Sequence, residues 1–572
     1  MALNALLALC VSVSANASNA VKSPNIVLIL ADDLGYSDLQ SYGGEIDTPN
    51  LDQLAKEGLS FSNYHTSASC APTRAMLLSG VDSHRAGVGN IAEAKTQSQA
   101  SSPFYNGSLN ENVVTVATLL KDKGYHTYMA GKWHLGYKQE KLRPINRGFE
   151  QTVMMPYSGA DNWQQRSYLP NYAEVEWFAN GKNITLPEDF YSSKYIVDKS
   201  IEFIDSNHKD NKPFFSYVAF QAVHIPVQAP KEYTEKYIGK YDDGWGALRK
   251  LRQKRVKELG LIPKDAAMSD VVTTQDWQAL TEEEKKYHSK SMAVYAGMVD
   301  AMDANIGRLI QHLKDIGEYD NTVFIFTSDN GGEASAPGDV SKLFPLWMWF
   351  EDYNQDYETL GEKGSYNYIG ASFASAVVGP LGHYKFYSGE GGLRVPMIIS
   401  GPALNKTLEG TVNKAFTYVK DLAPTILQLA NTAHPGIEYK GKVIEPITGK
   451  SLMPIVSNSH ESVHGPQDTI AYEIGGNAAL FKGDFKIMLN RPAVGDGIWH
   501  LYNIVKDPGE TQDLSAKMPQ LFKDMKLAYA QYEIDNGVLP VPSDYDQRRQ
   551  VLSNAIDVRV VRPIKAFFSR LF

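Results

Sequence analysis

The side chain in this sequence that is best suited to chemistry is a cysteine followed closely by a proline and an arginine. It is Cys70, in the stretch "SASCAPTRAMLLSG". Pro72 suits a first helical turn and Gly80 suits a helix end, so Cys70 is expected just ahead of a helix N-terminus. The exposed N–H groups of a helix start favour anions, and Arg74 lies near the same end. The cluster therefore suggests a site for an oxyanion.

Oxygen-bearing side chains follow two apolar runs that are typical of buried strands. "NIVLILADD" ends in Asp32 and Asp33, and "NTVFIFTSDNGG" contains Asp329 and Asn330. Hard oxygen ligands without a histidine cluster favour Ca²⁺ or Mg²⁺ over Zn²⁺. We expect one ion, and Ca²⁺ rather than Mg²⁺, because Ca²⁺ accepts more ligands and a looser geometry.

Basic side chains follow further strand candidates. "GYHTYMAGKWHLG" carries Lys132 and His134, "KPFFSYVAFQAVHIP" carries His224, and Lys385 precedes a glycine cluster and the strand candidate "RVPMIISGP". Each residue alone has an ordinary structural explanation, since a single Asp, Lys or His at a strand end is usually a cap, a surface group or a satisfied core residue. Together they would supply acids, bases and cations to one edge of a sheet.

The elements that must position these residues are short apolar strands alternating with amphipathic helical patterns such as "TPNLDQLAKEGL" and "VATLLKDKG". This alternation predicts an α/β fold with a large mixed, mostly parallel sheet sandwiched by helices. Ligands of such sheets bind beyond the carboxyl ends of the strands. We expect this main domain over residues 21–435, then a smaller α+β subdomain over 436–545 with a short antiparallel sheet and a packing helix. Its hairpin turn is expected at Lys482-Gly483-Asp484, and a basic, apolar tail would occupy residues 546–572.

Composition narrows the classes of protein that this chain can belong to. Its 572 residues are 43% hydrophobic with a net charge of −9, which argues against a general nucleic-acid footprint. Residues 1–20 have an apolar run followed by small residues, which predicts a signal peptide and export to the periplasm or the medium. No later stretch predicts an integral membrane span. One of the two cysteines lies in that leader, so a disulfide framework is excluded.

Several of these stretches resemble the formylglycine-dependent sulfatases of the alkaline phosphatase superfamily. "CAPTR" fits the C-x-P-x-R modification motif of that family, and "GYHTYMAGKWHLG" resembles its second signature. "DDLGYSDL" and "SDNGG" resemble its metal segments, and "WHLYNIVKDPGETQDL" its C-terminal stretch. The segment "YDDGWGALRKLRQKRVKELGLIP" is similar to bacterial arylsulfatases. The resemblance covers nearly the whole chain after the leader and implies an alkaline-phosphatase-like fold.

The resemblance implies a role for the unpaired thiol. A formylglycine-generating enzyme would oxidise Cys70 to Cα-formylglycine, whose hydrate carries two hydroxyls on one carbon. One hydroxyl would attack the sulfur of a sulfate ester, release the alcohol or phenol and leave a covalent sulfated intermediate. Deprotonation of the second hydroxyl would then expel inorganic sulfate and restore the aldehyde. A serine at position 70 could perform only the first step.

The resemblance also implies roles for the other residues. Asp32, Asp33, Asp329 and Asn330, with the modified Cys70, would hold the metal ion. Arg74 would stabilise the hydrate, Lys132 and His134 would neighbour it with His134 as the base, and His224 would be the general acid beside Lys385. The substrate would be an aryl or alkyl sulfate or a sulfated sugar.

Two other functions stay open at this point. Relatives with the same formylglycine site hydrolyse phosphonate monoesters or phosphodiesters, and a non-catalytic binder of sulfated glycans would share the fold. A two-zinc phosphatase is disfavoured, because the extra metal ligands are absent from the sequence. The aromatic segment 337–382 would either pack in the core or line an aryl or sugar pocket. The Lys/Glu-rich region 248–286 is expected to be a solvated helical excursion.

Overall fold

The computed structural model describes residues 23–492 and 494–557. The predicted signal peptide, residues 1–20, and residues 558–572 of the predicted tail (546–572) lie outside the described residues, whereas residues 547–556 of that tail form a helix. Among the described residues, no helix combines the length and the apolar character needed to cross a membrane.

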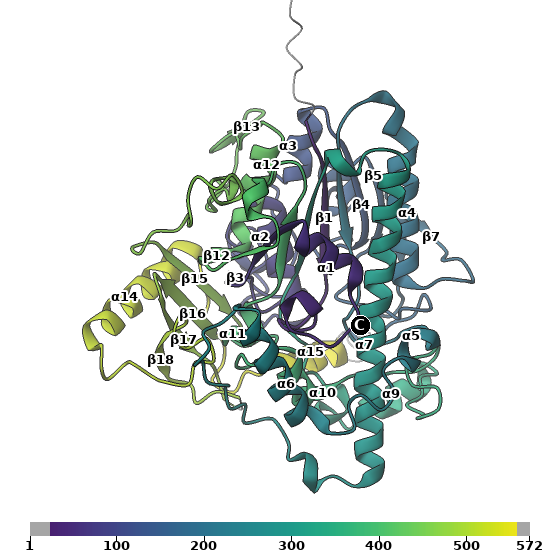
Figure 1. The fold of residues 1–572 in the computed structure, drawn as a ribbon, viewed down its shortest axis with the longest axis vertical. Helices are drawn as coiled ribbons and strands as arrows, with labels where there is room; N and C mark the ends of the chain where they lie inside the picture. The colour runs from purple at the N-terminus through teal and green to yellow at the C-terminus, as the bar shows by residue number, and fades with distance from the viewer. Residues whose placement is uncertain (1–22, 493, 558–572) are drawn as a thin grey trace, which may run out of the picture.

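A ten-stranded mixed sheet forms the centre of the structure (Figure 1). In spatial order its strands are β11 (Thr411–Asn413), β2 (Gly58–Phe61), β10 (Met397–Ser400), β9 (Thr322–Ser328), β1 (Asn25–Ala31), β8 (Phe214–Ala219), β4 (His126–Lys132), β5 (Gln151–Met155), β6 (Trp177–Ala179) and β7 (Lys182–Ile184). The block β9-β1-β8-β4-β5 is parallel, whereas β10 runs antiparallel to β9 and β2. Every residue of β1 and β9 is buried, as their continuous apolar runs predict.

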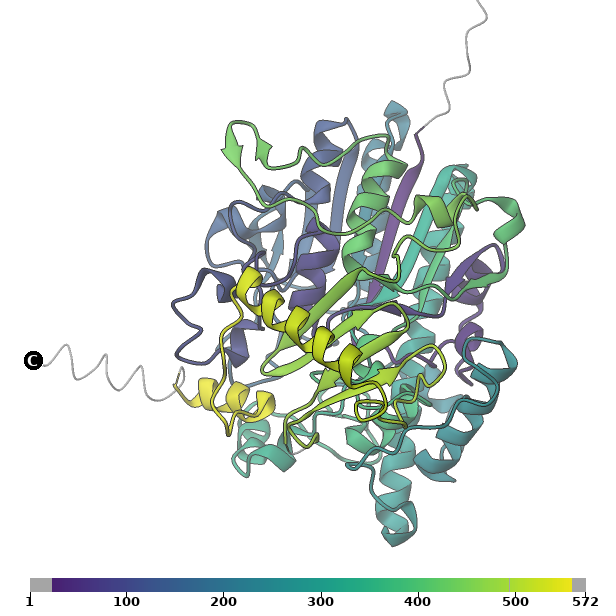
Figure 2. The same cartoon turned by 90° about the vertical axis from the view of Figure 1, so that its left-hand side faces the viewer.

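Helices cover both faces of this sheet (Figures 1 and 2). One layer contains α1 (Pro49–Lys56), α4 (Ser192–Asn207) and α7 (Glu282–Asp315), and the opposite layer contains α2 (Cys70–Ser79), α3 (Val116–Asp122) and α12 (Leu422–Leu429). A capping box between Thr281 and Glu284 starts α7. Gly80 ends α2 with φ 69°, a conformation that glycine adopts readily. The predicted fold class, with its large mixed sheet between helices, is confirmed.

Shorter elements fill the loops around the sheet. They are α5 (Lys231–Glu235), α6 (Gly244–Glu258), α8 (Pro337–Val340), α9 (Phe344–Phe350), α10 (Gly370–Val377), α11 (Glu390–Leu393), α13 (Met453–Val456), and the strand pairs β3 (Tyr64–His65) with β12 (Thr417–Tyr418) and β13 (Glu438–Tyr439) with β14 (Lys442–Val443). The prediction of a solvated helix in the Lys/Glu-rich region is only partly right. Lys254 on α6 is exposed, but Arg252 is fully buried and its guanidinium donates to Asp38 at 2.6 Å and to Glu45 at 2.8 Å.

A second, four-stranded antiparallel sheet follows near the C-terminus, as predicted. Its strands are β15 (Thr469–Ile474), β16 (Asn477–Lys482), β17 (Phe485–Leu489) and β18 (Trp499–Asn503). Helix α14 (Pro519–Asn536) packs Met525 and Tyr529 onto one face of this sheet. The other face buries Tyr472 and Phe481 against Leu393 of the larger unit. A last helix, α15 (Gln547–Ile556), ends the described chain.

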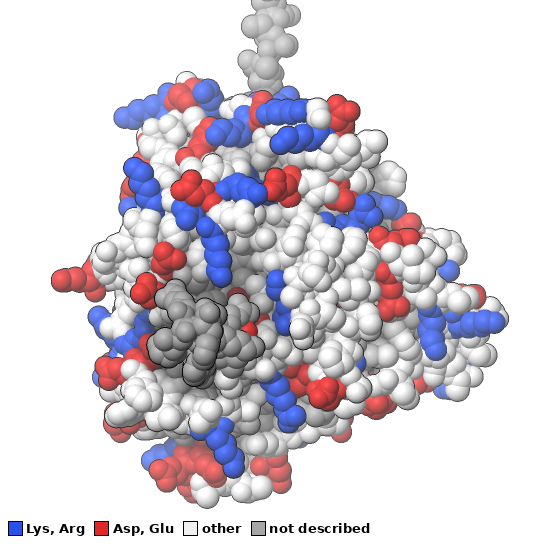
Figure 3. Space-filling view, turned by 180° about the vertical axis from the view of Figure 1, so that it is seen from behind, with Lys and Arg blue, Asp and Glu red and all other residues white. Residues whose placement is uncertain are grey.

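Charged side chains are mixed on the surface seen in Figure 3. Lys and Arg alternate there with Asp and Glu and do not gather into one basic field.

A buried histidine joins the small sheet to the large unit. His84 lies with Nε2 3.0 Å from Glu473 on β15 and Nδ1 3.5 Å from Asp82. Burial alone would lower the pKa of His84, but hydrogen bonds to Asp82 and Glu473 raise it from 6.5 to about 9. His84 is therefore cationic at neutral pH and forms a buried ion pair across the two units.

This pair makes stability depend on pH. Because the folded-state pKa of His84 is above the unfolded value, its contribution is complete below about pH 6.5 and is lost as the pH rises through about 9. We expect His84→Gln to destabilise the protein at pH 6 by on the order of 3 kcal/mol, and much less at pH 10. Melting temperatures of both proteins across this range would test it, with His460→Gln on the exposed surface as control. A gap between wild type and His84→Gln that does not change with pH would contradict the prediction.

Candidate active site

The carboxyl ends of four neighbouring strands meet at one edge of the large sheet, and the predicted site residues converge there. Their elements are the ends of β1 and β9, the end of β4 and the loop after β8, with the first turn of α2 and the loop before α11 opposite. All of the predicted residues lie in this region: Asp32, Asp33, Cys70, Arg74, Lys132, His134, His224, Asp329, Asn330 and Lys385. Each is at least 96% buried, so the site lies deep below the surface.

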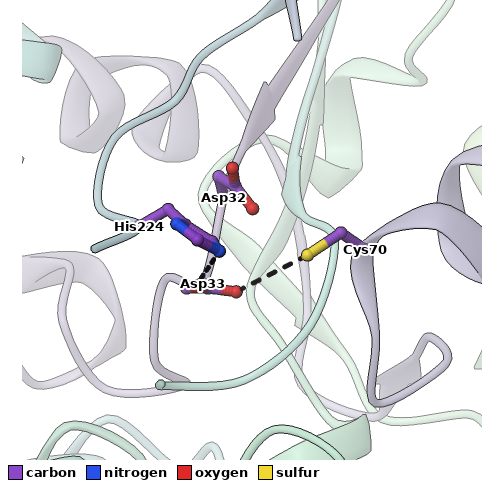
Figure 4. A group of neighbouring side chains, drawn as sticks. All are labelled: Asp32, Asp33, Cys70 and His224. Atoms are coloured by element: carbon purple, nitrogen blue, oxygen red, sulfur yellow. Dashed lines mark hydrogen bonds and ion pairs between the residues drawn. The ribbon is translucent and has the colours of Figure 1, made fainter. Parts of the chain in front are cut away.

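Asp33 is the centre of the cluster (Figure 4). Its Oδ1 lies 3.9 Å from Sγ of Cys70 and accepts a 2.7 Å hydrogen bond from Nδ2 of Asn330. Its Oδ2 lies 3.6 Å from Nε2 of His224. One atom each from Asp32, Asp33, Cys70 and His224 falls within 4.8 Å of the others, close enough to share one ion.

The donor atoms fit a hard divalent cation. Oδ1 of Asp32 and Oδ1 of Asn330 are buried and have no hydrogen-bond partner among the described residues. Leaving a buried acceptor without a partner costs about 1–3 kcal/mol, so a ligand is expected for both. Burial, together with the nearby Asp329, raises the pKa of Asp32 to about 6. A cation bound by these oxygens would satisfy both acceptors and would also lower the pKa of Asp32.

Arg74 and Lys132 form ion pairs with the buried carboxylates of Asp32 and Asp329. Arg74 is fully buried, and its Nη2 lies 2.7 Å from Asp329 and 3.8 Å from Asp32. Its Nη1 donates to the carbonyl oxygen of Lys132 at 2.8 Å. Nζ of Lys132 donates to Oδ2 of Asp32 at 2.6 Å. Each cation thus has a carboxylate partner, which is the condition under which charges are tolerated in a protein interior.

Two carboxylates that the sequence analysis missed hold the remaining bases. Oε2 of Glu93 lies 3.3 Å from Nε2 of His134, whose Nδ1 is buried without a partner among the described residues. Oε2 of Glu333 lies 2.7 Å from Nζ of Lys385, which also donates to Asp33 at 2.9 Å. Glu333 follows the "SDNGG" motif directly and could have been suspected; the stretch around Glu93 has no comparable signal.

The two histidines are neutral in this environment. Burial lowers the pKa of His134, against the opposing effect of Glu93. Burial, followed by the charge of Lys385, lowers the pKa of His224 well below its usual value. The Nδ1 atom of His224 lies 2.6 Å from the carbonyl oxygen of Ile225, so Nδ1–H donates there and Nε2 faces Asp33.

Cys70 itself is not activated as a thiol. It is the first residue of α2, with Ser69 as the N-cap, and only 2% of it is exposed. Burial and the nearby Asp329 raise the pKa of the thiol well above its ordinary value. The surrounding side chains therefore keep it protonated, which is the opposite of the environment that a catalytic thiolate needs.

A pocket opens onto Cys70. His134, His224 and Lys385 line it together with apolar side chains, which are Ile91, Leu169, Ile225, Pro337, Val340, Phe386, Val551 and Leu552. Of the aromatic segment 337–382, Pro337 and Val340 line the pocket, as far as the described side chains show. The rings of Phe344 and Tyr353 instead pack edge to face against the ring of Tyr366, so for them the packing interpretation is the right one.

Comparison with known proteins shows the family to which the chain belongs. A family model described as Sulfatase matches residues 24–432. The chain is 37% identical over 544 residues to an uncharacterized sulfatase of Schizosaccharomyces pombe, with 92% of this chain and 96% of the relative covered. It is 35% identical over 442 residues to an arylsulfatase of Klebsiella aerogenes, with 77% and 93% covered. The crystal structure of Ps i-CgsB in complex with k-i-k-neocarrahexaose has the same fold, with a TM-score of 0.63 at 24% identity and coverage of 95% and 99%. The chain therefore belongs to the sulfatase family and is a sulfuric ester hydrolase.

Proposed function

We propose that this enzyme hydrolyses sulfate esters through a formylglycine made from Cys70 by a formylglycine-generating enzyme. The observation that carries the proposal is the position of Cys70. It is an inert thiol at a helix start, it faces the substrate pocket, and it lies 3.9 Å from a carboxylate of the metal site. When Cys70 carries the aldehyde, its hydrate supplies one hydroxyl to take the sulfonate group and a second to release it.

Asp32, Asp33, Asp329 and Asn330 would hold one divalent cation, and Ca²⁺ suits this oxygen-rich set better than Mg²⁺. Such an ion supplies positive charge that polarises the ester and acidifies the nucleophile. Lys132 and Arg74 hold Asp32 and Asp329 in place through ion pairs, and their charges lower the pKa values of both carboxyl groups against the effect of burial.

His134 and His224 divide the proton transfers between them in this proposal. His134 is neutral at rest and is oriented by Glu93, so it can take the proton whose removal expels sulfate. His224 and Lys385 face the leaving group, and His224 donates the proton to the leaving oxygen. Because His224 is also neutral at rest, it must gain that proton when the negatively charged ester enters the pocket.

The substrate would be an aryl or alkyl sulfate or a sulfated sugar. A larger groove shares Glu93 and His134 with the pocket and is lined by Tyr137, Tyr157 and Tyr172. Tyrosine rings with polar neighbours are suited to sugar rings, and Ps i-CgsB was solved with a bound carrahexaose. Export to the periplasm or the medium, where sulfated glycans are encountered, fits the predicted leader.

Modification and substitution of Cys70 test the proposed nucleophile. In a host that installs formylglycine, the tryptic peptide containing Cys70 should lose the mass that corresponds to thiol-to-aldehyde conversion. Cys70→Ala should abolish hydrolysis of 4-nitrophenyl sulfate, and Cys70→Ser should release at most one equivalent of nitrophenol and stay sulfated. The measurements are peptide mass spectrometry and a stopped-flow burst assay.

A known formylglycine sulfatase expressed in the same cells serves as the control for modification. If Cys70 remained a thiol while the control was converted, the proposed chemistry would be wrong. Turnover of a phosphodiester in preference to the sulfate would replace the proposal with phosphoester hydrolysis at the same site.

Removal of the divalent cation tests the proposed metal site. Chelation should abolish hydrolysis and lower the melting temperature, because the buried carboxylates lose the charge that balances them. Ca²⁺ should restore both more fully than Mg²⁺. Asp33→Asn should bind the ion at least tenfold more weakly, roughly the effect of losing one charged ligand. If neither the chelator nor added Ca²⁺ changed the melting temperature, a resident ion would be excluded.

A further inference from the structure

The last described helix, α15, forms one wall of the active-site pocket. Arg548, Val551 and Leu552 line the same pocket as Cys70 and Lys385. This helix lies more than a hundred residues beyond the segment that the family model matches, which ends at residue 432. The pocket is therefore completed by a part of the chain that lies outside the segment matched by the family model.

Hydrogen bonds tie α15 to the segment that carries Glu93, the partner of His134. Nε2 of Gln547 donates to Oδ1 of Asn90 at 2.7 Å, and Nδ2 of Asn554 donates to the carbonyl oxygen of Glu93 at 2.8 Å. Just before the helix, the hydroxyl of Tyr545 donates to the carbonyl oxygen of Ala94 at 2.9 Å. The helix is thus held in a defined position relative to the catalytic bases.

Arg548 is the cation of this pocket that the hydrolytic centre does not use. Its side chain is 28% exposed, and its Nη2 lies 3.4 Å from Oδ2 of Asp546. Its Nε atom is buried and has no hydrogen-bond partner among the described residues. By contrast, Lys385 already pairs with Asp33 and Glu333. Arg548 therefore has donor capacity left for a ligand, and a guanidinium fits the planar or tetrahedral oxygens of an anion.

We propose that Arg548 binds a second anionic group on the leaving-group side of the substrate. The preferred substrate is then a sulfate ester whose alcohol or phenol carries a further carboxylate or sulfate, with its apolar part against Val551 and Leu552. This inference rests on the proposed function, and it narrows the substrate class within it. Arg548 is a specificity residue and takes no part in the bond changes at sulfur.

The test compares three esters that share one ring: phenyl sulfate, 3-carboxyphenyl sulfate and benzene-1,3-diyl disulfate. Sulfate release gives kcat and KM for wild type and for Arg548→Gln. The ratio of kcat/KM for the better dianionic ester to that for phenyl sulfate should fall by about 10- to 100-fold in the variant, as expected for one lost charge-assisted contact. The loss should be mainly in KM. The carboxylated and the disulfated esters distinguish the two kinds of second anion.

Two further variants separate charge from structure. Arg548→Lys keeps a cation and should recover part of the preference. Arg549→Gln makes the same substitution at the next, exposed position of α15 and should behave as wild type. Melting temperatures near that of wild type would show that α15 stays folded in all three.

Two results would overturn the inference. If wild type showed no preference for either dianionic ester, or if Arg548→Gln lost activity equally on all three, Arg548 would not recognise a second anion. The proposed function would survive that result. A wild-type enzyme with formylglycine in place that releases sulfate from none of the esters would instead overturn both.

Discussion

Burial of several carboxylates at one end of a parallel sheet is the constraint around which this structure is built. Asp32, Asp33 and Asp329 are all fully buried. Such a cluster cannot remain ionised without positive charge in contact with it. Arg74, Lys132 and Lys385 come from three different segments to provide that charge. The packing of α2, β4 and the loop before α11 therefore depends on the same ion pairs that form the site.

The charge count of this network also suits the substrate. Asp32, Asp33, Asp329 and Glu333 are opposed by three cationic side chains, which leaves one negative charge. A divalent cation would convert this into one positive charge, and a sulfate monoester carries one negative charge. A doubly charged phosphate monoester would be less well balanced, which is an electrostatic reason for selectivity between esters of similar shape.

How much of this could be predicted from sequence depended on whether the determinants were local. The strands β1 and β9 and the acids that follow them were predictable, because continuous apolar runs followed by polar breakers are local patterns. The short antiparallel sheet near the C-terminus was predictable for the same reason, through the turn at Gly483. The antiparallel direction of β10 and the buried position of Arg252 were not. Both are decided by partners distant in the chain, such as β9 for β10 and Asp38 for Arg252.

The same distinction separates the catalytic centre from the rest of the pocket. Residues of the centre lie in short motifs, so a motif can reveal them one by one. Glu93 and α15 have no motif, and they meet at the pocket only because Tyr545, Gln547 and Asn554 hydrogen-bond to residues 90–95. The sheet edge lies within the segment that the family model matches, whereas α15 lies outside it. Substrate choice in this enzyme should therefore be sought in α15 and the groove beside Glu93, and not in the residues around Cys70.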